Sequence, residues 1–153
     1  MLKNYYNKIA VGGTFDRLHN GHEFLIKTAF ELSDNILIGI TSDAFASLKC
    51  DNIEPCKVRI NRLRDIIKEF DKEYIIKAID DPYGTAIDDV DLEAIVVSHE
   101  TEDSAIKINE IRKKKGLKLL DIVVIEWILA EDNIPISSTR IRKGEIDQKG
   151  YLL

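Results

Sequence analysis

The sequence predicts an α/β protein with a doubly wound, five-stranded parallel sheet. Short apolar runs alternate with longer stretches of helical periodicity, and polar motifs follow the apolar runs. With 153 residues the chain can bury one substantial core, so we expect residues 1–153 to form a single domain. The predicted strands are Lys8 to Gly12, Asn35 to Thr41, Glu73 to Ile79, Ala94 to Ser98 and Asp121 to Ile128.

Apolar residues spaced three and four positions apart predict three helices between these strands. The third of them has acidic residues near its start, basic residues at its end and a stop at Gly116, as the helix dipole favours. The predicted helices are Gly21 to Ser33, Val58 to Phe70 and Ser104 to Lys115. The stretch Thr41 to Lys49 is predicted to be a loop after the second strand.

The most informative stretch is Gly12 to His22, directly after the first predicted strand. It indicates a glycine turn followed by a helix that begins around His19 and His22. A helix start presents unpaired N–H groups and the positive end of the helix dipole, which together suit a phosphate. Because two imidazoles there can donate hydrogen bonds to charge developing on that phosphate, the stretch favours a catalytic site.

A second polar segment, Ile136 to Gly144, follows the last predicted strand. Ser137 or Ser138 would cap a short helix, and Arg140, Arg142 and Lys143 would fall in its first turn or two, where cations oppose the helix dipole. Such a conflict is expected where function overrides stability, and a bound polyanion would resolve it. In a parallel sheet both polar segments lie at the same edge, so we expect them to converge on phosphates.

Together the two segments resemble the signatures of the nucleotidylyltransferase superfamily, a histidine-x-glycine-histidine motif and a serine-serine-threonine-x-x-arginine motif. Over about residues 8 to 150, the chain is similar to the phosphopantetheine adenylyltransferase family of archaeal and eukaryotic type. The further similar segments are Ile40 to Asp43, Asp81 to Gly84, Ile95 to Ser98, Glu100-Thr101, Ala130 to Asp132 and Pro135 to Asp147. This resemblance implies a Rossmann-like nucleotidylyltransferase fold with strand order 3-2-1-4-5.

The resemblance implies that an adenylyl group moves from ATP to 4′-phosphopantetheine, giving dephospho-coenzyme A and pyrophosphate in coenzyme A biosynthesis. The implied catalytic residues are His22 at the transition state, His19 at the ATP phosphates, and Lys49. Thr14, Phe15 and Lys49 are implied to bind the acceptor. The implied nucleotide-binding residues are Gly12, Gly13, His19, His22, Ser137, Ser138, Thr139 and Arg140.

This chemistry needs few special groups from the protein. A phosphomonoester acceptor is already ionised at neutral pH, so alignment and charge stabilisation replace a strong general base. Mg²⁺ is expected to arrive with ATP, and no residue is predicted to be a metal ligand. Asp16 is expected to order its loop through backbone hydrogen bonds.

Composition narrows the partners and the compartment. A net charge of −5 argues against a nucleic-acid partner, which usually meets a basic surface. No apolar run approaches the ~20 residues that span a bilayer, and Met1 to Tyr6 is too short and polar for a signal peptide. We therefore expect a cytoplasmic protein with no membrane partner, in which Cys50 and Cys56 are free thiols. The sequence leaves the oligomeric state open.

Two alternative functions stay open at this point. One is the same chemistry on another phosphate, such as FMN, nicotinamide mononucleotide or glycerol 3-phosphate, and the other is a non-catalytic nucleotide-binding regulatory module. Trp127 falls inside a predicted strand and Tyr83 is a single ring, so no platform for stacking a flavin is predicted. His99 is expected to be a loop residue.

Overall fold

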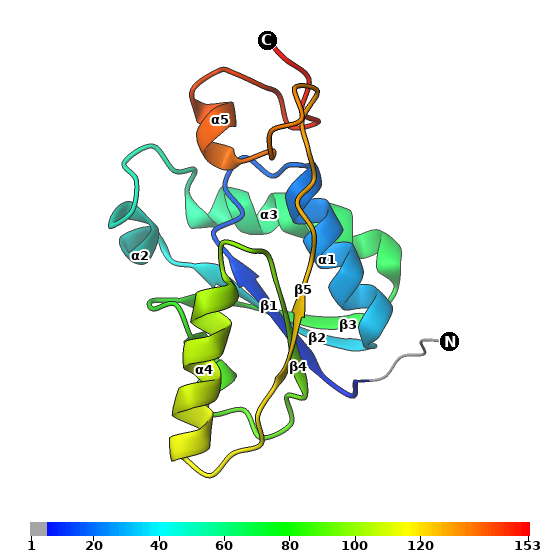
Figure 1. Ribbon diagram of the computed structural model, residues 1–153, viewed down its shortest axis with the longest axis vertical. Coiled ribbons are helices and arrows are strands. Elements are labelled where there is room, and N and C mark those ends of the chain that lie inside the picture. The colour runs from blue at the N-terminus through cyan, green and yellow to red at the C-terminus, as the bar shows by residue number, and fades with distance from the viewer. Residues whose placement is uncertain (1–5) are drawn as a thin grey trace.

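The computed structural model describes residues 6–153. Of the N-terminal segment used above to argue against a signal peptide, all but Tyr6 lies outside the described residues. Five parallel strands form one sheet in the order β3-β2-β1-β4-β5. The predicted fold class and the strand order that the resemblance implied are both confirmed. In Figure 1 the helices lie on both sides of this sheet.

The strands match the predicted ones closely, with one clear exception. They are β1 (Ile9–Gly13), β2 (Asn35–Thr41), β3 (Glu73–Ile79), β4 (Ala94–Val97) and β5 (Asp121–Val124). The prediction that the last strand continues to Ile128 is wrong. β4 ends at Val97, whose carbonyl accepts the final hydrogen bond from the Ile125 N–H at 2.9 Å, so the following residues have no neighbouring strand to pair with.

The helices include short ones that periodicity did not predict. They are α1 (Asn20–Leu32), α2 (Asp43–Ser47), α3 (Cys56–Ile67), η1 (Lys68–Phe70), η2 (Gly84–Ile87), α4 (Glu102–Lys114) and α5 (Ser138–Arg142). The stretch predicted to be a loop after the second strand contains α2, which is capped by Ser42 Oγ accepting from the Phe45 N–H at 3.2 Å. A helix of five residues is too short to show a helical period.

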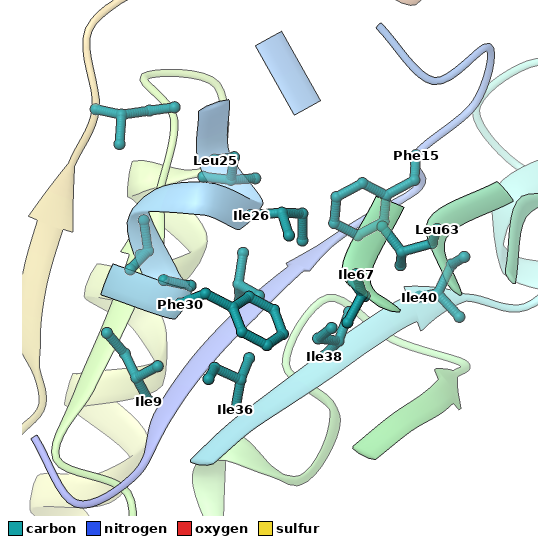
Figure 2. Packing of buried hydrophobic residues seen from close by; sticks show 14 of the residues in the cluster. Ile9, Phe15, Leu25, Ile26, Phe30, Ile36, Ile38, Ile40, Leu63 and Ile67 are labelled. Carbon is teal, nitrogen blue, oxygen red and sulfur yellow. The ribbon is translucent and has the colours of Figure 1, made fainter. Parts of the chain in front are cut away.

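Side chains alternate between the two faces of the sheet, and each face has its own core. On one face Ile9 and Val11 of β1 pack with residues of α1 and α3, as the cluster in Figure 2 shows. On the other face Ala10 packs with Ala105 and Ile108 of α4. Burial on both faces explains why the central strands are continuous apolar runs.

The carboxyl ends of the strands point toward the loops and α5, which Figure 1 places beyond that edge of the sheet. α5 follows the last strand by more than ten residues of chain, yet it lies against the segment before α1. The Asn20 N–H donates to the Gln148 carbonyl at 3.0 Å, which joins the start of α1 to the segment that follows α5. Within residues 6–153, no helix is long and apolar enough to cross a membrane.

Candidate active site

A cavity of about 470 Å³ opens at the carboxyl edge of the sheet. Its walls come from segments that follow all five strands, so the expectation that the polar motifs share one edge is confirmed. Every predicted site residue except Arg140 lines this cavity. The predicted residues that it brings together are Gly12, Gly13, Thr14, Phe15, His19, His22, Lys49, Ser137, Ser138 and Thr139.

The two histidines cap α1 reciprocally. His19 is the residue before the helix, and its Nδ1 accepts from the N–H groups of Gly21 at 3.0 Å and His22 at 3.4 Å. In return, His22 Nδ1 accepts from the His19 N–H at 3.2 Å. The two rings stack with centroids 3.7 Å apart. Capping therefore fixes both imidazoles against the backbone at the helix start.

This capping also determines which ring nitrogen faces other partners. A nitrogen that accepts a hydrogen bond carries no proton, so each neutral ring holds its proton on Nε2. Burial lowers the pKa of His19 to about 4, and burial followed by the adjacent His19 lowers the pKa of His22 well below its usual value. At neutral pH both side chains are therefore uncharged, and Nε2–H is the donor that each can offer to a ligand.

We expect the ligand-free protein to lose stability as the pH falls from about 6.5, the ordinary histidine pKa, toward 4. In that range the unfolded chain binds protons at these histidines while the folded chain leaves His19 neutral. Their contribution is complete above the unfolded pKa and is lost as the pH drops below it. Urea unfolding at several pH values measures this, with His19→Asn as control because asparagine retains a capping oxygen. An equal pH slope in the variant would contradict the assignment.

Gly21 is a site residue that the sequence reasoning did not single out as such. A Cβ on Gly21 would lie 2.9 Å from Cε1 and 3.0 Å from Nδ1 of His19. Any larger residue therefore pushes the capping imidazole away from its backbone donors. The glycine inside the histidine-x-glycine-histidine motif was the available signal, because a close approach to a neighbouring ring requires the absence of a side chain.

The predicted acceptor residues divide into exposed and buried groups. Thr14 Oγ1 accepts from Thr41 Oγ1 at 3.1 Å, and Lys49 is an exposed side chain just after α2. Phe15, in contrast, is 2% exposed and packs edge-on against the His22 ring, with centroids 5.4 Å apart. Although Phe15 borders the cavity, its ring gives an acceptor little surface and mainly supports His22.

Asp16 joins the two predicted motifs, but its carboxylate bonds to the backbone of the loop before α3 rather than, as expected, to that of its own loop. Its carboxylate, 2% exposed, accepts from the Glu54 N–H at 2.8 Å and pairs with the guanidinium of Arg142 at 2.5 Å. Its carbonyl accepts from Ser138 Oγ at 2.6 Å. These contacts seat α5 on the loop that precedes α1, and they place Arg142 on the cavity wall.

Arg140 was predicted to hold the ATP phosphates, but the structure places its side chain away from the cavity. Its guanidinium pairs with Asp132 at 2.5 Å and with Glu145 at 3.0 Å, and it does not line the cavity. The hydrogen bond from Arg140 holds the pKa of Asp132 below its usual value. Two carboxylates thus offset the unfavourable helix-dipole position. The motif spacing, serine-serine-threonine-x-x-arginine, places its arginine at Arg142.

Trp127 also lies where the sequence did not predict it. It comes after the end of β5, lines the cavity and is 40% exposed. The His99 ring stacks on it with centroids 5.4 Å apart, and His99 Nε2 lies 3.8 Å from a carboxylate oxygen of Glu126. His99 itself does not line the cavity, which agrees with its prediction as a loop residue.

The strand order, with neutral imidazole donors at the start of the first helix and serine, threonine and arginine side chains across the cavity, defines a nucleotidyltransferase. The family model of cytidylyltransferase-like proteins matches residues 10–144. Phosphopantetheine adenylyltransferase of Methanothermobacter thermautotrophicus is 49% identical, over 99% of this chain and 93% of its own length. The chain belongs to the phosphopantetheine adenylyltransferase family.

Another relative agrees with this assignment, and two solved structures share the fold. Phosphopantetheine adenylyltransferase of Archaeoglobus fulgidus is 43% identical, over 95% of this chain and 99% of its own length. A crystal structure of a protein of unknown function from the same organism superimposes with a TM-score of 0.73 at 36% identity, covering 85% and 99% of the two chains. Tyrosyl-tRNA synthetase of A. fulgidus shares the fold, with a TM-score of 0.67 at 13% identity over 88% of this chain and 59% of its own.

Proposed function

We propose that the protein transfers the adenylyl group of ATP to 4′-phosphopantetheine, giving dephospho-coenzyme A and pyrophosphate. The names of the relatives support 4′-phosphopantetheine as the acceptor. The observation that carries the chemistry is one cavity that His19 and His22 line together with Thr14, Lys49 and the segment of Ser137.

The strand order supports a division of that cavity into two halves. β2 and β3 lie on one side of β1, and β4 and β5 lie on the other. Thr14 and Lys49 follow β1 and β2, so the acceptor phosphate is assigned to that half. Ser137, Arg142 and Trp127 come after β5, so ATP is assigned to the other half, where Trp127 offers a ring face to adenine.

In the proposed reaction an oxygen of the acceptor phosphate attacks the α-phosphorus of ATP. The new phosphorus–oxygen bond forms as the bond to the β-phosphate oxygen breaks, and pyrophosphate leaves with that electron pair. His22 Nε2–H donates to the charge that develops on the α-phosphate, and His19 Nε2–H holds the phosphates in line. Because both imidazoles are already neutral and held by capping, they need no rearrangement to act as donors.

Mg²⁺ is proposed to enter bound to ATP. Among the described residues, no group of three or more histidine, cysteine, aspartate or glutamate side chains is placed to hold a metal ion. The ligands of such an ion are expected to be mainly phosphate oxygens and water. When bound, the ion neutralises charge on the phosphates of ATP and of the leaving pyrophosphate. Arg142 and Thr139 orient the same phosphates from α5.

A product assay with a panel of acceptors tests this function. With ATP and Mg²⁺, we expect kcat/KM for 4′-phosphopantetheine to exceed that for FMN, nicotinamide mononucleotide or glycerol 3-phosphate at least about tenfold, or ~1.4 kcal/mol in transition-state binding. CTP in place of ATP serves as the donor control. Preference for another acceptor would show that the proposed acceptor is wrong and would leave the proposed adenylyl transfer standing. No turnover with any acceptor would favour a regulatory nucleotide-binding module.

A further inference from the structure

Arg59 of α3 is a completely buried arginine beneath the acceptor half of the cavity. Its Nη1 donates to the carbonyls of Thr14 at 2.9 Å and Thr41 at 2.8 Å. Its Nε donates to the Glu54 carbonyl at 2.7 Å, and its Nη2 lies 3.3 Å from Asp43 Oδ1. One side chain thus holds the segment after β1, the end of β2, the start of α2 and the loop before α3.

Burial of a guanidinium is costly unless its donors are satisfied, and an apolar side chain could fill the same volume. The cost is met here by bonds to backbone carbonyls at the cavity. Because Nη1 binds the carbonyls of both Thr14 and Thr41, it sets the relative position of their side chains, whose hydroxyls meet at 3.1 Å. Both threonines line the cavity.

The same side chain supplies charge. Asp43, its one carboxylate partner, is 69% exposed and therefore largely screened by water, and its oxygen also accepts from the Cys56 N–H at 2.7 Å. A buried cation behind Thr14 and Thr41 is screened less than a surface cation. It therefore favours a doubly charged phosphate in front of these residues.

We propose that Arg59 is a positioning residue for the acceptor phosphate, acting through Thr14 and Thr41 and through its charge. The proposal rests on the proposed function, because it assigns the acceptor to this half of the cavity. The proposal predicts different effects on the binding of the two substrates. The hydrogen bonds of Arg59 go to Glu54, Thr14, Thr41 and Asp43 and not to the Ser137 to Arg142 segment, so loss of its geometry should weaken acceptor binding and leave ATP binding little changed.

Arg112 of α4 is a matched control. It is also completely buried, and it donates to three backbone carbonyls, those of Ala86, Asp89 and Lys118, each at 2.8 Å. None of these three residues lines the larger cavity. Arg112 Nη2 has no partner among the described residues, whereas that of Arg59 faces Asp43. Replacing Arg112 with lysine therefore disturbs a second buried guanidinium that is bonded to backbone carbonyls, on the other side of the sheet, without touching Thr14 or Thr41.

The experiment compares Arg59→Lys and Arg112→Lys with the wild type in steady-state kinetics, with each substrate varied in turn. Lysine keeps the charge but cannot reproduce the planar fork, so we expect KM for 4′-phosphopantetheine to rise about tenfold in Arg59→Lys and KM for ATP to change less than about twofold. Arg112→Lys should lower Tm comparably and keep both KM values within about twofold of the wild type. Calorimetric titration of 4′-phosphopantetheine alone should show the same weakening in Arg59→Lys.

The outcomes separate the inference from the proposed function. If the wild type makes dephospho-coenzyme A and Arg59→Lys binds the acceptor normally, or Arg112→Lys weakens it equally, the positioning role is wrong. If the wild type does not use 4′-phosphopantetheine, the proposed function fails and this inference falls with it. If Arg59→Lys does not fold, Thr41→Val replaces it, because valine removes the hydroxyl between Arg59 and Thr14. An unchanged acceptor KM in Thr41→Val would then overturn the proposal.

Discussion

Replacing His22 with alanine is expected to lower kcat about 100- to 1,000-fold, the usual cost of losing one donor to transition-state charge. The reason is that His22 lines the cavity as a neutral, capped imidazole whose Nε2–H can reach a ligand. Its loss also removes one half of the reciprocal cap, which should cost about 1 kcal/mol of stability and leave the protein folded. Single-turnover kinetics and urea unfolding measure the two effects separately.

His99→Ala is the control for this prediction. His99 lies outside the cavity lining and stacks on Trp127, so its loss should leave kcat at saturating substrate within about twofold of the wild type. Near-normal kcat in a folded His22→Ala protein would exclude His22 from the transition state. A comparable loss in both variants would show that the assay reports general disturbance of the cavity.

Replacing Arg142 with alanine is expected to lower kcat/KM for ATP about 100-fold. Arg142 lines the cavity, and its guanidinium also donates to Thr139 Oγ1 at 3.2 Å, so its loss removes a cation and loosens α5. Stability should fall too, because the buried carboxylate of Asp16 loses its pairing with Arg142. Arg142→Lys should recover only part of the activity, since lysine cannot bond Asp16 and Thr139 in the same fork.

Arg140→Ala is the matched variant two residues earlier. Because Arg140 pairs with Asp132 and Glu145 and does not line the cavity, we expect a lower Tm and kinetics within about threefold of the wild type. If the kinetic loss falls on Arg140→Ala and spares Arg142→Ala, the assignment of the phosphate-facing arginine is reversed. ATP titrations of both variants, followed by Tm and by initial rates, distinguish these results.

Apolar periodicity predicted the secondary structure correctly where an element is long and has neighbours along its whole length. β2 and β3 begin and end as predicted, because the two strands pair with each other along their whole length. It failed for α2, whose five residues are stabilised by the Ser42 cap, and beyond Val124, where β5 has no partner strand. Both failures involve structure that depends on a single bond or a neighbour far along the chain.

The sequence by itself determined the α/β class, the strands and the two polar motifs, and its resemblance supplied the strand order. Local pattern suffices there because periodicity and glycine turns act over a few residues. The spacing of the serine-serine-threonine-x-x-arginine motif points to Arg142, but only the tertiary structure shows that Arg142 lines the cavity and Arg140 does not. Residues two apart on a helix point roughly 200° apart, so Arg140 and Arg142 cannot face the same way. α5 is held against Asp16 by Ser138 and Arg142, and in this position Arg142 points toward the cavity and Arg140 toward Asp132. The contact with Asp16 joins residues more than a hundred positions apart in the sequence.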